Sequence, residues 1–266
     1  MQPGFITANY VAREIGFNMT EGWMQGDRAT NAYYQPIETY AERIGELLAL
    51  IATQGYTTVD IWTAHLHWAW ATPAHIAILR EQLARYGLTA VCYGGRFGEN
   101  VAELRQVCAV ASAVGMRVLA GSTGALKQDR AATVAVLAEY DCVLAIENHP
   151  AEKTPADVLA QIGDGAGGRI GTAVDTGWWG TQGYDAAQAI AELYPHIMSV
   201  HLKDVLAAGA HETCRFGAGV VPIAACVALL KARGYTGPIA VEHEPDHFDP
   251  TDDCIAMRQM VLEWWR

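Results

Sequence analysis

Residues 143–175 read VLAIENHPAEKTPADVLAQIGDGAGGRIGTAVD, and their pattern predicts two strands with a helix between them. The runs 143–147 and 170–175 are short and apolar, as buried strands are. The run 155–161 starts with Pro155, a residue that suits the first turn of a helix. A strand, a helix and a second strand in this order predict parallel pairing through a helical crossover.

The same alternation continues from this unit to both ends of the chain. One example is the helix predicted over 38–53, which carries an apolar stripe at i, i+3, i+4 and i+7: Ile44, Leu47, Leu48 and Ile51. Strands are predicted at 5–8, 58–62, 89–93, 117–120, 143–147, 170–175, 197–201 and 238–242. Helices are predicted at 38–53, around 76–83, and at 101–114, 130–140, 155–161, 185–193, 221–233 and 253–265.

Eight strands, each followed by a helix, predict a single (β/α)₈ barrel over residues 1–266. Closed barrels of this kind typically need about 250 residues, which matches the length of the chain. An open, doubly wound sheet is the structural alternative. It is disfavoured because no G-x-G-x-x-G motif follows the first strand. No linker, low-complexity segment or second domain is visible.

Composition narrows the class of protein. Hydrophobic residues make up 51% of the chain and charged residues 18%, so a large core is expected. The net charge of −11 argues against nucleic acid as the main partner, because such a surface repels phosphates. No apolar run reaches the roughly 18 residues of a membrane span. The N-terminus lacks a basic segment followed by an apolar stretch, and the six cysteines show no C-x-x-C pair, so a cytoplasmic protein is predicted.

Four late strands each end in a residue that can bind a metal ion: Glu147, Asp175, His201 and Glu242. In a barrel the carboxyl ends of the strands converge on the mouth where active sites form. Any one of these residues could be a hydrogen-bonded, partly buried polar group. Four in register on four strands favour a metal site. Three carboxylates and an imidazole suit Mn²⁺, Mg²⁺ or Co²⁺ better than an ion that prefers thiolates.

The motifs around these residues resemble the sugar phosphate isomerase/epimerase group of xylose isomerase-like TIM barrels. They are Ala145-Ile146-Glu147-Asn148-His149-Pro150, Val174-Asp175-Thr176-Gly177, His201-Leu202-Lys203-Asp204 and Val241-Glu242-His243-Glu244. The resemblance implies one divalent ion, Mn²⁺ first, held by Glu147, Asp175, His201 and Glu242. It also implies a sugar or keto-sugar substrate, with Glu147 and Glu242 moving protons on its two faces. A divalent ion acidifies a proton next to a carbonyl, and a nearby base removes it.

Two residues complicate a plain epimerase assignment. Trp178 stands where many members of this group have a histidine, so an aromatic wall replaces a polar contact to metal or substrate. His149 lies two residues after Glu147, so both side chains are expected to face the mouth. His149 is therefore a candidate base, and enzymes of this group that eliminate a substituent from 3-keto sugars use a histidine in a similar setting. The alternative is a loop histidine bonded to a neighbouring carbonyl.

The remaining candidates are residues predicted to contact the substrate or to orient another site residue. Lys203 is predicted to stabilise an enolate oxygen, or else to be a salt-bridged lysine; Asp204 is predicted to orient Lys203 or a metal-binding histidine. Substrate contacts are also predicted for residues that follow strands or lie in loops: His65, His67, Trp178, Arg215 and Trp62. Tryptophans near the strand ends favour a sugar or aryl-glycoside pocket, because aromatic faces pack against the C–H faces of sugars.

The leading functional hypothesis is a metal-dependent sugar isomerase or epimerase that abstracts a proton α to a carbonyl. The alternative is a lyase or dehydratase of the same family that expels a β-substituent from a keto-sugar. A DNA-repair endonuclease of the same barrel type would need more metal ligands and a basic groove. A non-catalytic sugar-binding barrel is the fourth hypothesis, and the complete set of candidate ligands argues against it. The oligomeric state stays open, with a homo-oligomer as one option.

Overall fold

The computed structural model describes residues 1–266, and eight parallel strands close into a barrel, as predicted. Around the barrel the strands follow the order β1-β10-β7-β6-β5-β4-β3-β2, and β1 closes it by pairing with both β10 and β2. The barrel strands are β1 (Gly4–Ile6), β2 (Thr58–Trp62), β3 (Thr89–Arg96), β4 (Val118–Ser122), β5 (Val143–Glu147), β6 (Ile170–Asp175), β7 (Ile197–Leu202) and β10 (Ile239–Val241).

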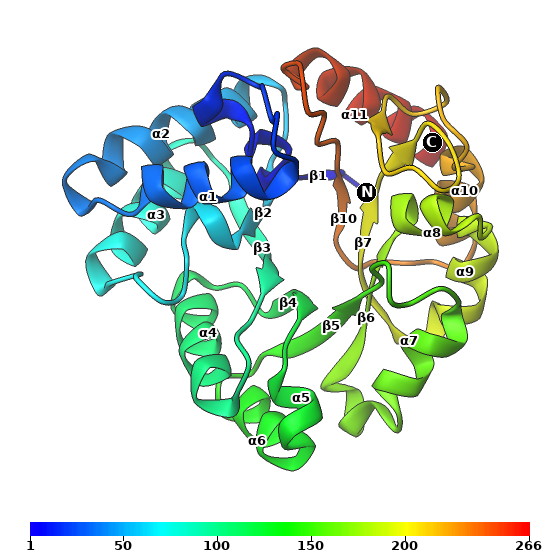
Figure 1. The fold of residues 1–266 in the computed structure, drawn as a ribbon, viewed down its shortest axis with the longest axis horizontal. Helices are drawn as coiled ribbons and strands as arrows, with labels where there is room; N and C mark the ends of the chain where they lie inside the picture. The colour runs from blue at the N-terminus through cyan, green and yellow to red at the C-terminus, as the bar shows by residue number, and fades with distance from the viewer.

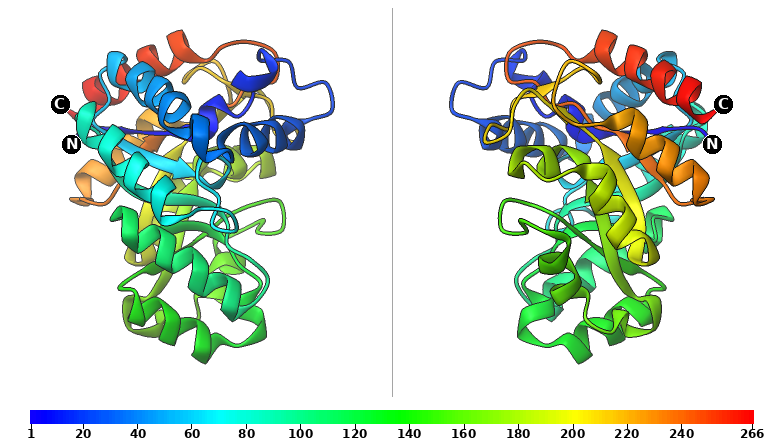
Figure 2. Two further views of the ribbon diagram at one scale, coloured as in Figure 1. Left: turned by 90° about the vertical axis from the view of Figure 1, so that its left-hand side faces the viewer. Right: turned by 90° about the vertical axis from the view of Figure 1, so that its right-hand side faces the viewer.

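Eight helices connect or follow these strands, and they surround the barrel (Figures 1 and 2). They are α2 (Ile37–Thr53), α3 (Pro73–Arg85), α4 (Val101–Val114), α6 (Arg130–Glu139), α7 (Pro155–Ile162), α9 (Ala186–Leu193), α10 (Ile223–Ala232) and α11 (Thr251–Trp265). None of the helices combines the length and the apolar composition needed to span a bilayer.

The loops after the strands carry structure that the sequence pattern did not predict. Three additional helices are α1 (Trp23–Tyr34), α5 (Ala125–Gln128) and α8 (Thr176–Gln182), and a small antiparallel hairpin pairs β8 (Asp204–Val205) with β9 (Thr213–Cys214). Short 3₁₀ segments lie at Thr7–Tyr10, Arg13–Ile15, Thr63–His65, Gly165–Gly168 and Tyr194–His196. The first of them ends β1 at Ile6, two residues earlier than predicted. The predicted strand 89–93 continues to Arg96.

Side-chain size differs between the two faces of the strands. A large core of 54 buried residues includes the apolar side chains of the strands and the surrounding helices. A separate cluster of small buried residues comprises Cys92, Ala120, Ala145 and Ala173 on four adjacent strands. Ala145 lies on the same strand face as Glu147, since side chains at i and i+2 point the same way. Small residues therefore lie on the face that carries the strand-end polar groups.

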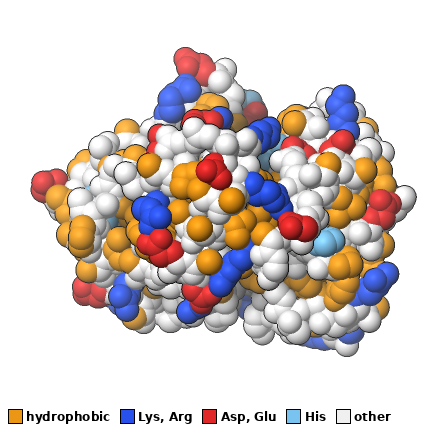
Figure 3. Space-filling view, turned by 90° about the horizontal axis from the view of Figure 1, so that it is seen from below, with side chains coloured by type: hydrophobic (Ala, Val, Ile, Leu, Met, Phe, Trp, Pro, Cys, Tyr) orange, Lys and Arg blue, Asp and Glu red, His pale blue; other side chains and the backbone are white.

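Charged side chains of both signs intermingle on the face shown in Figure 3, without a continuous patch of either sign. Ion pairs on the protein surface include Arg130–Asp164 and Arg169–Asp141, each at 3.1 Å. Exposed pairs of this kind usually contribute little to stability, about 0–1 kcal/mol. The charges that need an explanation are the buried ones at the barrel mouth.

Candidate active site

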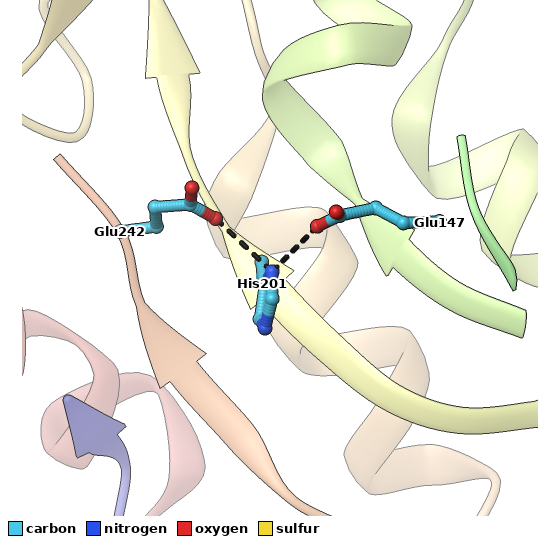
Figure 4. Close-up of side chains that lie close together, drawn as sticks. All are labelled: Glu147, His201 and Glu242. Carbon is cyan, nitrogen blue, oxygen red and sulfur yellow. Dashed lines mark hydrogen bonds and ion pairs between the residues drawn. The ribbon is translucent and has the colours of Figure 1, made fainter. Parts of the chain in front are cut away.

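Three side chains meet at the carboxyl ends of β5, β7 and β10. His201 Nδ1 lies 2.8 Å from Glu147 Oε1 and 3.1 Å from Glu242 Oε2. Figure 4 shows the two glutamates reaching this nitrogen from opposite sides. Glu147 and Glu242 are 5% exposed and His201 is 1% exposed. Burial alone would lower the pKa of His201, but Glu242, Asp60 and Glu147 raise it well above its usual value.

Asp175, the fourth predicted ligand, is held separately. Its Oδ1 accepts hydrogen bonds from the backbone N–H groups of Gly177 and Trp178 and so caps the start of α8. Its Oδ2 lies 3.0 Å from Lys203 Nζ. Only Glu147, His201 and Glu242 bring ligand atoms within 4.8 Å of one another. The structure therefore gathers three of the four predicted ligands and pairs Asp175 with a lysine.

Lys203 is buried among carboxylates. Its Nζ lies 2.8 Å from Glu242 Oε1 and 3.1 Å from Glu244 Oε2, in addition to its contact with Asp175. Burial would lower the pKa of Lys203, but the three carboxylates raise it well above its usual value, so the ammonium stays charged. The lysine is thus salt-bridged, which was the alternative to direct contact with an enolate, and it also lines the cavity described below.

Two acidic residues of the site were missed by the sequence analysis. Asp60 is 1% exposed in β2, and its Oδ2 lies 3.4 Å from His201 Nε2, while neither carboxylate oxygen has a hydrogen bond. Glu244 binds Lys203 and accepts a hydrogen bond from Trp23 Nε1 at 3.0 Å. Burial raises the pKa of Glu244 to about 7, although Lys203 opposes this. An acid in the middle of the apolar strand 58–62 was the available signal for Asp60, because such a group is rarely buried without a role.

His149 and Trp178 lie next to the cluster. His149 Nε2 is 3.6 Å from Glu147 Oε2, its Nδ1 is 3.2 Å from the Glu147 carbonyl oxygen, and 40% of its side chain is exposed. The Trp178 ring stacks on His211 with 3.5 Å between ring centroids and lies 5.8 Å from the His149 ring. Trp178 therefore forms an aromatic wall between two imidazoles. His211 is a member of this wall that the sequence analysis did not identify.

A cavity of about 850 Å³ opens over these residues. The predicted site residues that line it are Glu147, His149, Asp175, Lys203, Glu242, Trp62, His67 and Trp178. His201 lies beneath them, almost completely buried.

Two predicted substrate contacts do not line the cavity. His65 is 1% exposed, with Nδ1 3.1 Å from Thr7 Oγ1 and its ring against Tyr34, because the 3₁₀ turn Thr63–His65 directs it into the protein interior. Arg215 forms an ion pair with Asp253, with 2.7 Å between Nε and Oδ1. In this structure neither side chain faces the cavity, and substrate contact by His65 and Arg215 stays a prediction.

Asp204 also differs from the prediction. Its buried carboxylate accepts hydrogen bonds from four backbone N–H groups, those of Val205, Gly217, Gly219 and Val221. It contacts neither Lys203 nor a histidine through its side chain, so it organises the loop after β7 instead of orienting a site residue.

The buried His65 predicts acid sensitivity. Burial lowers its pKa to about 3 in the folded protein, whereas an unfolded chain titrates near 6.5. The unfolded state then binds the proton more readily, so the stability is complete above about pH 6.5 and is lost as the pH falls toward 3. Between pH 7.5 and 5 the loss is about 2 kcal/mol. Urea unfolding of the native protein and His65→Gln at both pH values tests this, and equal losses in the two proteins would contradict it.

Comparisons with known proteins place this barrel in a family. The chain belongs to the xylose isomerase-like TIM barrel family, whose model matches residues 11–260. No curated protein matches the sequence.

Solved structures share the fold at low sequence identity. A xylose isomerase-like TIM barrel protein from Mycobacterium smegmatis in complex with magnesium is 17% identical, with a TM-score of 0.72 over 100% of this chain and 97% of that one. AsbF from Bacillus anthracis, assigned as a 3-DHS dehydratase, is 13% identical, with a TM-score of 0.70 over 98% and 99%. D-allulose 3-epimerase from Methylomonas sp., in complex with D-allulose, is 19% identical, with a TM-score of 0.65 over 85% and 92%.

Proposed function

We propose that this protein is a divalent-metal-dependent isomerase or epimerase that removes a proton from the carbon next to a carbonyl of a sugar or keto-sugar. The observation that carries the proposal is the approach of Glu147 and Glu242 to His201 from opposite sides of its side chain (Figure 4). Membership of the family and the similarity in fold to a D-allulose epimerase support a sugar as the substrate.

The residues present fit a divalent cation. Glu147, His201 and Glu242 supply two carboxylates and one imidazole within 4.8 Å, a donor set that suits Mn²⁺, Mg²⁺ or Co²⁺. Glu242 Oε2 is buried without a hydrogen bond although it lies 3.1 Å from His201 Nδ1, which bonds to Glu147. A buried carboxylate oxygen without a donor is costly, and a cation would satisfy it. When bound, the ion would polarise the substrate carbonyl and acidify the adjacent proton. Mn²⁺ is the ion we propose first.

The chain's own groups account for the proton transfers. One glutamate takes the proton from carbon, and the C–H electron pair moves toward the carbonyl oxygen to give an enediolate. The Lys203 ammonium, held at the Glu242 side, provides fixed positive charge near the developing negative charge. Return of a proton to the opposite face of the same carbon by the other glutamate gives the epimer. Return of the proton to the neighbouring carbon, with the hydroxyl proton moving from one oxygen to the other, gives the isomer. Trp178 and His149 border this space.

Proton NMR in D₂O tests the proposal, with Mn²⁺-loaded protein and a panel of ketoses, inososes and 3-keto glycosides. We expect deuterium at one carbon together with a new epimer or aldose. If metal analysis shows a bound ion and no substrate of the panel undergoes either exchange or conversion, the proposal is contradicted.

A second candidate function is β-elimination from a keto-sugar, and the position of His149 supports it. Its partly exposed imidazole lies beside Glu147 in the cavity, where it could act as the base while Glu147 binds the ion. In D₂O this reaction would release water or an aglycone and leave an unsaturated keto-sugar. His149→Ala should then lower the rate about 10²–10⁴-fold with the metal content unchanged. Normal activity of this variant would exclude His149 as the base.

Asp60 is predicted to strengthen metal binding by holding His201. A carboxylate that faces the far nitrogen of a metal-binding histidine fixes the tautomer and ring orientation, and losing it typically lowers affinity 10–100-fold. Asp60→Asn should therefore raise the Mn²⁺ dissociation constant about 10–100-fold, measured from the EPR signal of free Mn²⁺. The metal-free variant is expected to fold but to melt at a lower temperature, because it loses the contact with His201 Nε2 at 3.4 Å that helps to raise the pKa of this histidine.

The control for this experiment is Asp141→Asn, which changes an exposed acid between α6 and β5 that pairs with Arg169. A purely structural role for Asp60 would lower the stability of the metal-free protein and leave the Mn²⁺ dissociation constant of the folded protein unchanged. Mn²⁺ binding within twofold of native in Asp60→Asn would contradict the prediction.

A further inference from the structure

The cavity extends well beyond the Glu147–His201–Glu242 cluster. It continues across the barrel mouth to α1 and the ends of β2 and β3, where its lining includes Trp23, Met24, Asp27, Trp62, His67 and Arg96. Its volume of about 850 Å³ lies near the upper end of the range of about 300–1,000 Å³ for pockets that hold drug-sized ligands. A single six-carbon sugar at the cluster is smaller than such ligands and would leave this part of the cavity unfilled.

Two tryptophans form a preformed wall in that part. Trp62 Nε1 donates to Asp27 Oδ1 at 2.7 Å, and Trp23 Nε1 donates to Glu244 Oε1 at 3.0 Å. The two rings meet edge to face, with centroids 5.3 Å apart and planes at 88°. Each indole therefore has its only N–H group bonded and its orientation set. The two indoles therefore present aromatic surface to a ligand, with the carboxyl groups of Asp27 and Glu244 beside it.

The charges around this wall favour an uncharged ligand. Asp27 lies directly against the Trp62 indole, so a phosphate or carboxylate beside it would meet another acidic group, whereas Glu244 beside Trp23 is bound by Lys203. The two lining residues of opposite sign are already paired, Arg96 with Glu99 and Lys203 with three carboxylates. Met24 at the rim is 52% exposed and adds a flexible apolar contact. Aromatic faces with adjacent hydrogen-bonding groups suit the C–H face and hydroxyls of a sugar ring, or an aryl ring.

We propose that this compartment, lined by Trp23, Met24, Asp27 and Trp62, binds a second ring that is glycosidically linked to the reacting sugar. The substrate is then an uncharged glycoside, with either a sugar or an aryl group as its aglycone, and free monosaccharides are poorer ligands. The position of the reacting sugar rests on the proposed function. The aromatic compartment itself is part of the observed cavity and does not depend on that function.

Calorimetric titration of the Mn²⁺-loaded protein tests the proposal. The ligands are methyl glucosides of both anomers, compared with cellobiose, maltose and the phenyl glucosides of matching anomers. We expect a ring glycoside to bind about tenfold more tightly than the methyl glucoside of the same anomer. A preference for cellobiose or maltose identifies a sugar aglycone, and a preference for a phenyl glucoside identifies an aryl one.

Two variants locate the effect. Trp62→Ala should reduce the ratio between ring and methyl glycoside affinities toward one. Met24→Ala should reduce it in part, and because Met24 is half-exposed, this variant is expected to fold normally. Trp265→Ala, at the end of α11 and outside the cavity, is the control that should keep the native ratio.

The proposal is overturned if no ring glycoside binds at millimolar concentration, if the native ratio is within twofold of one, or if both cavity variants keep the native ratio. Its failure differs from failure of the proposed function. Selective binding without deuterium exchange would reject the isomerase reaction and keep the aromatic compartment. Deuterium exchange on free ketoses without selective binding of ring glycosides would keep the isomerase reaction and reject the aromatic compartment.

Discussion

Glu242→Gln and Glu147→Gln are each expected to lower the rate of deuterium exchange by about 10²–10⁴-fold, the contribution typical of a positioned acid–base group. Each glutamine keeps the size of the side chain but can no longer take a proton from carbon. Glu242→Gln has a second effect, because Lys203 loses one of its three carboxylate partners and His201 loses one of its neighbours. Exchange rates by NMR and metal content by elemental analysis together separate loss of chemistry from loss of the ion.

The matched control is Glu139→Gln, an exposed acid on α6 that pairs with Arg105 far from the cavity. It should exchange deuterium at the native rate. If either site variant retained both its metal and the native exchange rate, that glutamate would not be an acid–base group in the reaction. If both did so, the proton-transfer proposal would fail.

Asp204→Ala is expected to lower the free energy of unfolding by about 3–5 kcal/mol, the cost typical of removing one partner from a buried charged network. The variant removes the acceptor of four backbone N–H groups, which come from both arms of the loop that follows β7. For a chain of this size the melting temperature should fall by about 10 °C, measured by calorimetry. Asp204→Asn should lie between alanine and native, because its amide oxygen still accepts hydrogen bonds.

Glu212→Gln provides the comparison. Glu212 lies in the same loop after β7, and its side chain accepts none of the four backbone N–H groups that Asp204 binds. It should unfold at the native temperature. An Asp204→Ala protein with native stability would show that the loop's backbone groups are satisfied without this carboxylate.

The barrel itself was predictable because its signals are local. The alternation of short apolar runs with helices such as 38–53 depends on neighbours a few residues apart, and each strand needs little else to be recognised. The positions of Glu147, His201 and Glu242 were predictable for a related reason. In a barrel of parallel strands, all strand ends meet at one mouth, so the topology brings these residues together once the strands are located.

The contacts among the site residues were less predictable. Asp60 meets His201 across the barrel, and Lys203 meets Asp175 and Glu244 between the ends of neighbouring strands; none of these partners is close in the sequence. A lysine two residues after a strand-end histidine can face solvent, substrate or a carboxylate, and only the position of the other strands selects among these. The orientations of His65 and Arg215 depended on loop geometry, for which the sequence pattern carried no signal.

The amino-acid sequence by itself therefore determined the strand and helix order, the closed barrel, and the set of strand-end residues at its mouth, because these follow from periodicity and chain direction. Only the tertiary structure decided that three of the four candidate ligands converge, that Lys203 pairs with Asp175, and that the cavity continues to an aromatic wall on α1 and β2. The physical reason is the sequence distance over which each kind of interaction acts. Periodicity reports which side of an element is buried, whereas ion pairs and cavity walls depend on side chains brought together from distant parts of the chain.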